Sequence, residues 1–310
     1  MNKDLVHRTV LLHEAVQALN IVEDGCYVDG TFGRGGHSKE ILKKLGKNGC
    51  LLGIDKDSQA IDAGLELAKV DSRFQIKQGS FVQIAEVIEK SSSISHVNGL
   101  LLDLGVSSPQ LDDPERGFSF QNDGPLDMRM DKNSGMTASE WLDVAEEGEI
   151  ARVLKVYGEE RFSRRIASAI VAERVSGSIQ TTLQLASIIT EAIPFREKNK
   201  HPATRSFQAI RIYLNNELGD LEKILEGSLE VLSKGARLVV ISFHSLEDRI
   251  VKRFMRNQAL GDRLPPGVPV QYEQSNARLK LIGKPIFASK REVEENPRSR
   301  SAVMRVAEIL

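Results

Sequence analysis

The sequence is poor in cysteine and in long apolar runs. It holds only two cysteines, Cys26 and Cys50, in 310 residues. A paired-cysteine metal motif and a disulfide framework are therefore not expected, and we predict two buried free thiols and a reducing, cytoplasmic location. No apolar run approaches the ~20 residues of a membrane span, and residues 1–13 lack a signal-peptide core. These absences exclude disulfide-stapled and membrane-spanning classes, so no membrane partner is expected.

The chain also has no large excess of positive or negative charge, but its charged residues are distributed unevenly. The whole chain carries a formal net charge of −1. Residues 249–310 hold 13 Lys/Arg and 6 Asp/Glu, a net charge of +7, which leaves −8 for the remainder. Such asymmetry indicates either a basic face for nucleic acid or an ordinary solvated surface, and charge alone does not separate the two.

The first hundred residues alternate strand and helix patterns. Apolar strands are expected at 26–29, 51–54, 74–77 and 99–104, with helices between them at 37–45, 58–68 and 81–88. Strands separated by helices predict an α/β fold with a parallel sheet and right-handed crossovers.

After the fourth strand the pattern changes. Residues 106–131 are rich in Gly, Pro, Ser and Asp, and helical periods follow, up to one that runs from Phe207 to Leu225. The strand pattern resumes at 237–241. We therefore predict one domain formed by residues 1–105 and 216–310, interrupted by a mostly helical insertion at 106–215.

A glycine-rich turn follows the first strand. Asp29, Gly33 and Gly35 match the D-x-G-x-G-x-G pattern that is common in methyltransferases, with Thr31 in place of the first glycine. The dinucleotide pattern G-x-G-x-x-G instead fails, because its third position is Ser38. Glycines in such a turn let a ligand approach the backbone.

Three further positions follow strand ends. Asp55 comes about twenty residues after the glycines, where a carboxylate can accept both hydroxyl hydrogens of a ribose; its structural alternative is a helix cap. Phe81 follows the third strand and is placed to stack on an adenine, or to fill the core. Asp103 ends the central fourth strand, where open α/β sheets bind ligands, which favours a functional carboxylate.

The chain resembles a known family over nearly its whole length. The RsmH (MraW) family, bacterial enzymes that methylate N4 of a cytidine in 16S ribosomal RNA, is similar in long and unusual motifs. They lie at residues 28–37, 102–112, 116–120, 124–131, 157–162, 201–205, 242–249 and 296–301.

The resemblance implies a class I S-adenosylmethionine-dependent (Rossmann-like) methyltransferase sheet with a helical insertion for substrate recognition. It implies 16S ribosomal RNA in the small subunit as substrate and partner. No metal is expected, and the sequence leaves monomer and homodimer open. The implied cofactor contacts, with the glycine turn, are at Gly33, Gly35, Gly36, His37, Asp55, Phe81, Asp103 and Gln110.

Methylation of an amine sets the candidate catalytic residues. The N4 lone pair must be aimed at the methyl group, and the nitrogen must then lose a proton. Asp103 is the first candidate for this work, and Ser107 or the Ser108–Pro109 backbone is the second. Whether Asp103 serves the base, the cofactor or both stays open, and DNA remains an alternative substrate.

Three other motifs have competing interpretations. Arg116, Phe118 and Phe120 either line a pocket for an unstacked base or anchor a loop in the core. His244 with Ser245 suggests a hydrolase, but the Gly-x-Ser-x-Gly turn is missing. Arg161, Arg164 and Arg165 suit RNA backbone contacts or a solvated helix face.

Overall fold

The computed structural model describes residues 8–89, 96–195, 201–261 and 276–310. Their chain divides into two compact units: residues 1–105 together with 218–310, and residues 106–217. Each unit has a hydrophobic core of its own, and each is described separately below.

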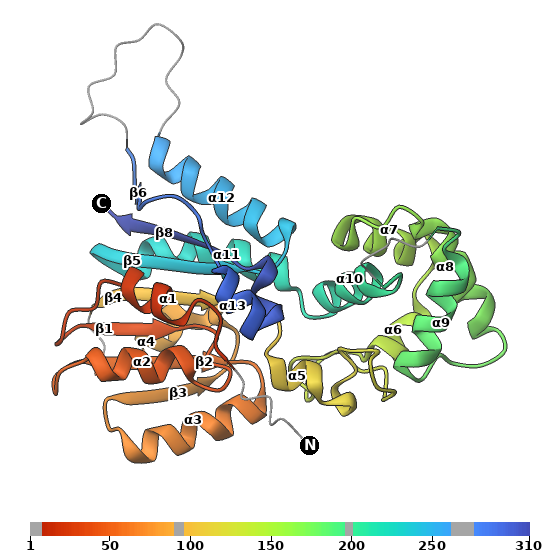
Figure 1. Ribbon diagram of the computed structural model, residues 1–310, viewed down its shortest axis with the longest axis horizontal. Coiled ribbons are helices and arrows are strands. Elements are labelled where there is room, and N and C mark those ends of the chain that lie inside the picture. The colour runs from red at the N-terminus through yellow and green to blue at the C-terminus, as the bar shows by residue number, and fades with distance from the viewer. Residues whose placement is uncertain (1–7, 90–95, 196–200, 262–275) are drawn as a thin grey trace, which may run out of the picture. The chain divides into compact units, whose positions relative to one another are not determined.

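The first unit is built on one twisted sheet, in which the described residues form eight strands (Figure 1). Their order is β3-β2-β1-β4-β5-β8-β6, and β7 also pairs with β8. The strands are β1 (Cys26–Asp29), β2 (Cys50–Asp55), β3 (Phe74–Gln78), β4 (Val97–Asp103), β5 (Leu232–Ser242), β6 (Leu279–Leu281), β7 (Ile286–Phe287) and β8 (Val303–Ile309). The first five strands are parallel to one another, whereas β8 runs antiparallel to its neighbours.

Helices cover both faces of this sheet (Figure 1). Because side chains alternate along a strand, Leu100 and Leu102 of β4 face one layer while Leu101 faces the other. One layer holds α4 (Ile84–Glu89), α11 (Glu217–Val231) and α12 (Ser245–Leu260); the other holds α1 (Leu12–Ala18), α2 (Gly36–Lys44) and α3 (Ser58–Val70), and α13 (Lys290–Glu295) precedes β8. The predicted Rossmann-like α/β class is confirmed.

The second unit is helical. Its helices are α5 (Ser108–Asp112), α6 (Ala138–Val144), α7 (Glu147–Gly158), α8 (Ser163–Arg174), α9 (Thr182–Ala192) and α10 (Thr204–Leu214). Thr137 and Glu140 form the predicted capping box at the start of α6. At the end of α7, a Cβ on Gly158 would lie 2.7 Å from the Arg205 carbonyl oxygen of α10, so the two helices pack there only because this residue is glycine.

One predicted helical period is divided between two helices. The apolar spacing from Phe207 to Leu225 does not belong to one helix, because α10 ends at Leu214 and α11 begins at Glu217. Asn216 between them has a φ of 51°, in the left-handed region that breaks a helix. The two halves of the pattern therefore pack into the cores of different units.

The loop residues Arg116, Phe118 and Phe120 anchor the core of the second unit. Arg116 is 1% exposed and donates to the carbonyl oxygens of Arg129 and Met130. Phe118 is buried and packs in the same cluster, which Phe120 also contacts. The structure thus favours the core interpretation of this motif over an open base pocket.

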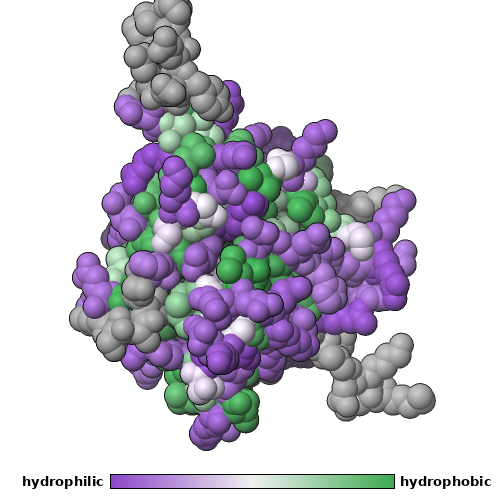
Figure 2. All heavy atoms as spheres, turned by 90° about the vertical axis from the view of Figure 1, so that its left-hand side faces the viewer, coloured by the Kyte–Doolittle hydropathy of each residue, from purple (hydrophilic) through white to green (hydrophobic). Residues whose placement is uncertain are grey.

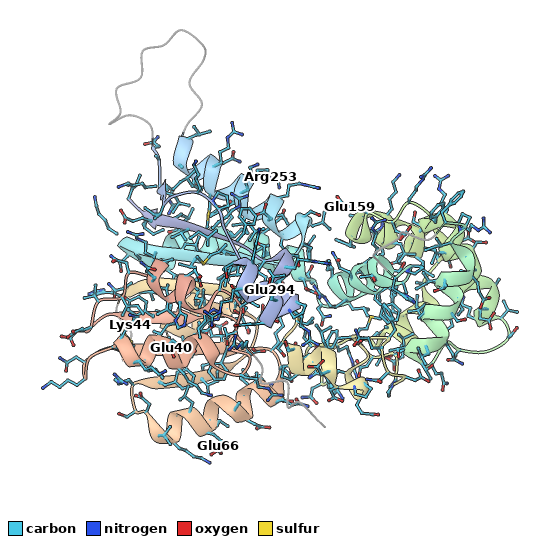
Figure 3. The ribbon with its side chains drawn as sticks, viewed as in Figure 1. Glu40, Lys44, Glu66, Glu159, Arg253 and Glu294 are labelled. Carbon is cyan, nitrogen blue, oxygen red and sulfur yellow. A yellow bond between two sulfur atoms is a disulfide. The ribbon has the colours of Figure 1, made fainter. Side chains whose placement is uncertain are left out.

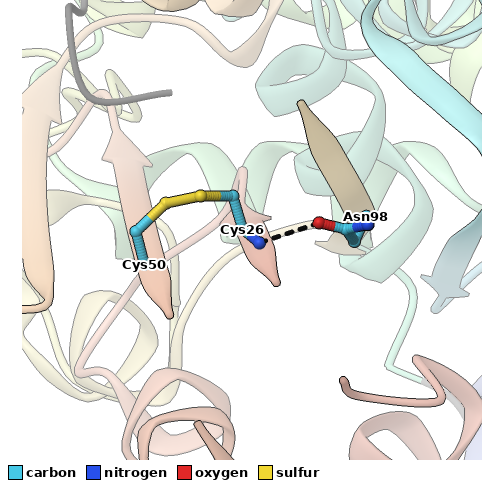
Figure 4. Close-up of a disulfide and its surroundings, with 3 residues drawn as sticks. All are labelled: Cys26, Cys50 and Asn98. Carbon is cyan, nitrogen blue, oxygen red and sulfur yellow. Dashed lines mark hydrogen bonds between the residues drawn. A yellow bond between two sulfur atoms is a disulfide. The ribbon is translucent and has the colours of Figure 1, made fainter. Parts of the chain in front are cut away.

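The two cysteines correct the prediction of buried free thiols. Cys26 and Cys50 begin the adjacent strands β1 and β2, lie directly opposite each other in the register, and are joined by a disulfide (Figure 4). Both residues are half-buried rather than buried. The backbone N–H of Cys26 also donates to Asn98 Oδ1 at 2.9 Å, which fixes this end of β1 beside β4.

Among the helices of the described ranges, none is both long enough and apolar enough to cross a membrane. The face shown in Figure 2 is mostly hydrophilic, with apolar areas scattered between hydrophilic residues. Scattered apolar side chains of this kind are ordinary on a protein surface.

Candidate active site

The strand order reverses between β1 and β4, and the site residues of the first unit gather at the carboxyl ends of these strands. Strand β1 pairs with β2 on one side and with β4 on the other, and both pairings are parallel. The crevice at such a reversal is where open α/β sheets bind their ligands.

The glycine turn between β1 and α2 has the geometry that its sequence predicts. Gly33 and Gly35 have φ values of +56° and +73°, which L side chains rarely adopt. A Cβ on Gly33 would meet no atom closer than the Thr31 carbonyl oxygen at 4.0 Å, so the space above this residue is open. Gly36 is packed instead, because its Cβ would collide with Thr9.

The two residues that depart from glycine fingerprints each hold a carboxylate-bearing residue. Thr31 Oγ1 accepts a hydrogen bond from the Asp103 backbone N–H at 2.6 Å. The buried Ser38 hydroxyl donates to Asp29 Oδ2 at 2.7 Å. A glycine at either position would leave that group without its partner, so these side chains tie the turn to the ends of β1 and β4.

Asp29 is a buried carboxylate whose pKa is raised. It is 1% exposed, and burial raises its pKa to about 6, although the hydrogen bonds from Ser38 and the Thr31 backbone lower it. The nearby charge of Asp55 raises the pKa further. Asp29 is enclosed by the turn, so we assign it to holding the turn in shape.

Asp55 ends β2 and is free of the capping role that was its alternative. The N-cap of α3 is Asp57, whose side chain accepts from the Gln59 N–H. Asp55 Oδ2 accepts from the Gly33 N–H at 2.8 Å, and Oδ1 accepts from the Asp57 N–H at 2.9 Å. Burial raises the pKa of Asp55, while these backbone donors lower it.

Asp103 presents an unsatisfied oxygen at the end of β4. Its Oδ1 is buried and has no hydrogen-bond partner among the described residues, while Oδ2 lies 3.8 Å from His37 Nδ1. The His37 Nε2 lies 3.2 Å from the Val10 carbonyl oxygen, which can only accept, so Nε2 carries the proton and Nδ1 faces Asp103. Burial, followed by the charges of Asp29 and Glu247, raises the pKa of Asp103 well above its usual range.

Phe81 follows β3 at the start of a short 3-10 helix, Phe81–Gln83. Its half-buried ring packs against the core cluster, and its centroid lies 6.0 Å from Lys56 Nζ. The ring is thus fixed by core contacts on one side, which suits a wall for a flat ligand.

The second unit starts at Val106, shortly after Asp103, and its first helix, α5, begins at Ser108. Ser107 caps this helix: its Oγ accepts from the Gln110 N–H, and its own N–H donates to Gln110 Oε1 at 2.8 Å. Ser108 and Pro109 form the first turn. A local structural role therefore accounts for the side chains of Ser107 and Gln110 as the chain stands.

His244 is a helix cap. Its Nδ1 accepts from the Glu247 N–H at 3.4 Å, and its Nε2 lies 3.1 Å from Glu247 Oε1 without hydrogen-bond geometry. With its ring held against Glu247, His244 does not form the hydrolase dyad with the exposed Ser245. No sequence pattern indicates that Glu247 raises the pKa of Asp103, since the two are 144 positions apart and are brought near each other by the pairing of β4 with β5.

Comparison with known proteins finds one matching family and several similar solved structures. The sequence model of the MraW methylase family matches residues 4–310. Similar solved structures include an rRNA-methylase-like protein from Clostridium thermocellum (10% identity, TM-score 0.47, 98% of this chain and 100% of that one). An rRNA methylase from Streptococcus thermophilus (8%, 0.44, 98% and 98%) and a methyltransferase-like protein from Streptococcus mutans in complex with SAH (11%, 0.43, 98% and 99%) are also similar.

Proposed function

Because the chain belongs to the MraW methylase family, and is thus a methyltransferase dependent on S-adenosylmethionine, we propose that it methylates the exocyclic N4 of a cytidine in bacterial 16S ribosomal RNA. The observation that supports this target best is Asp103 Oδ1, a buried carboxylate oxygen without a partner among the described residues. An amine carries N–H groups and would therefore supply the hydrogen-bond donor that this oxygen lacks.

The donor set of the first unit fits S-adenosylmethionine. Gly33 leaves open space where other residues carry a side chain, and Asp55 offers a carboxylate for ribose hydroxyls. We assign cofactor binding to Gly33, Gly35, Gly36, His37, Asp55, Phe81, Asp103 and Gln110. The cofactor carries a net positive charge near its sulfonium and ammonium groups, and the carboxylates of this unit complement that charge.

Asp103 has the properties of a proton acceptor. When bound, S-adenosylmethionine supplies the methyl group: the N4 lone pair forms the new C–N bond, the C–S pair stays with sulfur, and N4 releases one proton. A carboxylate whose pKa is raised by burial accepts that proton more readily than an exposed aspartate does. A hydrogen bond from the N4 amine to Asp103 would also hold N4 in line with the methyl group. Asp103 is itself held by the hydrogen bond from its backbone N–H to Thr31.

Ser107, Ser108 and Pro109 are assigned a supporting role in catalysis. Ser108 begins α5, and the carbonyl oxygens of Ser107 and Pro109 already accept from the Leu111 and Asp113 N–H groups; each has a second lone pair with which to accept from an amine. Amino-directed DNA methyltransferases carry a proline motif after the same strand, and Ser108-Pro109-Gln110 matches part of that motif.

Two exposed basic surfaces are proposed to contact RNA phosphates. On α12, Arg249, Lys252, Arg253 and Arg256 are exposed at the spacing of one helical face, and Arg253 projects outward in Figure 3. In the second unit, Arg161, Arg164 and Arg165 are exposed around the start of α8. We propose that residues 106–215 form the substrate-recognition domain.

The proposed location is the cytoplasm, where ribosomal subunits assemble, and either a monomer or a homodimer can carry out this reaction. No group of three or more His, Cys, Asp or Glu side chains in the described ranges has the arrangement of a metal site.

The decisive experiment identifies the methylated product. Purified protein and methyl-tritiated S-adenosylmethionine would be incubated in three separate reactions. These contain small ribosomal subunits, free 16S ribosomal RNA or duplex DNA. Mass spectrometry of the digested nucleosides should find N4-methylated cytidine from the ribosomal substrate, at one position, and Asp55→Ala should remove it. Ribosomal RNA from cells that lack and then regain the protein should lose and recover the same product.

Two outcomes would overturn the proposal. Methylation at a ring carbon or a ribose hydroxyl would exclude N4 as the acceptor. Methylation of duplex DNA with no transfer to either ribosomal substrate would replace RNA with DNA.

A further inference from the structure

The ends of β2 and β3 are joined by a carboxylate from a distant helix. Asp220 Oδ2, in α11, accepts from Lys56 Nζ at 2.6 Å and from the Ser80 hydroxyl at 2.9 Å. Lys56 directly follows β2 and Ser80 lies just after β3. One oxygen atom therefore holds two segments that are separated by a whole helix and strand.

The helix that carries Asp220 is fixed in place. Leu221, Ile224 and Leu225 of α11 are each 1% exposed and belong to the core cluster on one face of the sheet. The Asp220 side chain is 12% exposed and that of Lys56 is 24% exposed, so their ion pair is shielded from much of the solvent. Removing either partner would leave the other charge poorly compensated.

The two segments that Asp220 joins hold the residues assigned to the adenosine half of the cofactor. Asp55, assigned to the ribose, precedes Lys56, and Phe81, assigned to the adenine, follows Ser80. Ser80 also caps the 3-10 helix of Phe81 by accepting from the Val82 N–H at 3.3 Å. The Gly79 N–H donates to the Asp55 carbonyl oxygen at 2.8 Å, so the same segments are linked by backbone as well.

An ordinary ion pair would stabilise the fold without regard to ligand. The arrangement at Asp220 differs because its two donors come from the two segments that flank the ribose and adenine positions, and because Lys56 Nζ also lies 6.0 Å from the Phe81 ring centroid. Releasing the carboxylate would free Lys56 and the Ser80 hydroxyl together and loosen both walls at once.

We propose that Asp220 is a positioning residue for the adenosine half of S-adenosylmethionine: it fixes the spacing of the ribose and adenine walls without touching the methyl-transfer site. This inference rests on the cofactor residues assigned under the proposed function. It predicts that the loss on mutation is a loss of cofactor affinity, and that turnover at saturating cofactor is kept.

The test is calorimetry of Asp220→Asn with two ligands. S-adenosylhomocysteine carries both halves of the cofactor, whereas 5′-methylthioadenosine carries the adenosine half alone. We expect affinity for both ligands to fall by the same factor, roughly tenfold. In methylation assays KM for the cofactor should rise by a similar factor while kcat changes less than twofold.

Controls separate this role from general stability. Lys56→Gln breaks the pair from its other side and should reproduce the same equal losses, even if Asp220→Asn folds poorly. Asp71→Asn is the matched control, because Asp71 pairs with Arg73 at 20% exposure and lies before the amino end of β3, whereas Ser80 follows its carboxyl end. It should leave both affinities unchanged, whatever it does to the melting temperature.

The outcomes are distinguishable. Folded Asp220→Asn and Lys56→Gln proteins that bind 5′-methylthioadenosine as tightly as the unmodified protein would overturn the inference and leave the cofactor assignment intact. Failure of the unmodified protein to bind S-adenosylhomocysteine would instead overturn the cofactor assignment itself.

Discussion

Thr31 Oγ1 accepts a 2.6 Å hydrogen bond from the backbone N–H of Asp103, 72 positions further along the chain. The contact joins the glycine turn to the end of the central strand. It explains why a threonine stands where the common methyltransferase pattern has glycine, since glycine has no acceptor to offer.

Replacing Thr31 with valine tests this contact. Valine keeps the shape but leaves the Asp103 N–H unpaired, which should cost about 1–3 kcal/mol of unfolding free energy. The same change should lower kcat, because Asp103 loses its anchor. Chemical denaturation and single-turnover methylation measure the two effects, with Thr31→Ser as the control that keeps the hydroxyl; equal behaviour of valine and serine would remove the assigned role.

The Asp29 carboxyl should make stability depend on pH. Burial raises its folded pKa from 3.8 to about 6, so the folded state holds this proton more tightly than the unfolded state does. The stability that the protonated carboxyl contributes is complete below about pH 4 and is lost as pH rises through 6, by on the order of 3 kcal/mol. Asp29→Asn should remove this contribution to the pH dependence.

Other carboxylates also titrate in that range, so the measurement is a difference between proteins. Unfolding free energies of the unmodified and Asp29→Asn proteins should diverge between pH 4 and 6 and run parallel above pH 7. Curves that stay parallel throughout would mean that Asp29 titrates normally.

Asp103 should couple cofactor binding to proton release. Its pKa is raised by burial and by Asp29 and Glu247, with His37 Nδ1 as its near neighbour. A cationic ligand favours the ionised carboxylate, so affinity for S-adenosylmethionine should increase with pH through the Asp103 pKa. Calorimetry in buffers of different ionisation enthalpy should detect release of a proton, and Asp103→Asn should abolish it; unchanged release in that variant would point to another group.

Mutation of Asp103 also separates its two candidate roles. If Asp103→Ala lowers single-turnover methylation even at saturating cofactor, the residue acts on the transferring nitrogen. If saturating cofactor restores the rate, its role is cofactor binding alone.

The exposed arginines should govern the salt dependence of RNA binding. Neutralising phosphate contacts reduces the slope of log affinity against log salt by close to one for each contact. Changing Lys252, Arg253 and Arg256 to glutamine should therefore flatten this slope while leaving S-adenosylhomocysteine binding unchanged. Changing Arg161, Arg164 and Arg165 to alanine tests the second unit in the same way. An unaltered slope would mean that the substituted residues do not contact RNA and only face solvent.

The disulfide between Cys26 and Cys50 should act on stability through the segment it closes. The cysteines are 24 positions apart and enclose the glycine turn and α2, and closing a loop of this size contributes roughly 3 kcal/mol. Reductant should lower the melting temperature of the oxidised protein, and should not affect a Cys26→Ser/Cys50→Ser protein. A reductant-insensitive melting temperature in the oxidised protein would contradict the stabilising role.

The sequence by itself determined much of the local structure. Strand and helix periods predicted the α/β unit, because burial on a sheet or against a helix imposes its own spacing on apolar residues. The positive φ values of Gly33 and Gly35, and the capping box of Thr137 and Glu140, also follow from residue type at fixed spacing. The place of Asp103 at the end of a buried strand also follows from the sequence, whereas its role in the site stays a prediction.

Tertiary structure decided which residues meet. The partners of Thr31, Ser38 and Asp220 depend on strand order and helix packing, which local patterns do not encode. The apolar spacing between Phe207 and Leu225 continues across the left-handed turn at Asn216, although this turn redirects the chain into another core. The pairing of Cys26 with Cys50 likewise depends on the parallel register of β1 and β2, which places the two sulfur atoms side by side. Periodicity records how each segment is buried, whereas contacts between segments are fixed only when the strands have paired.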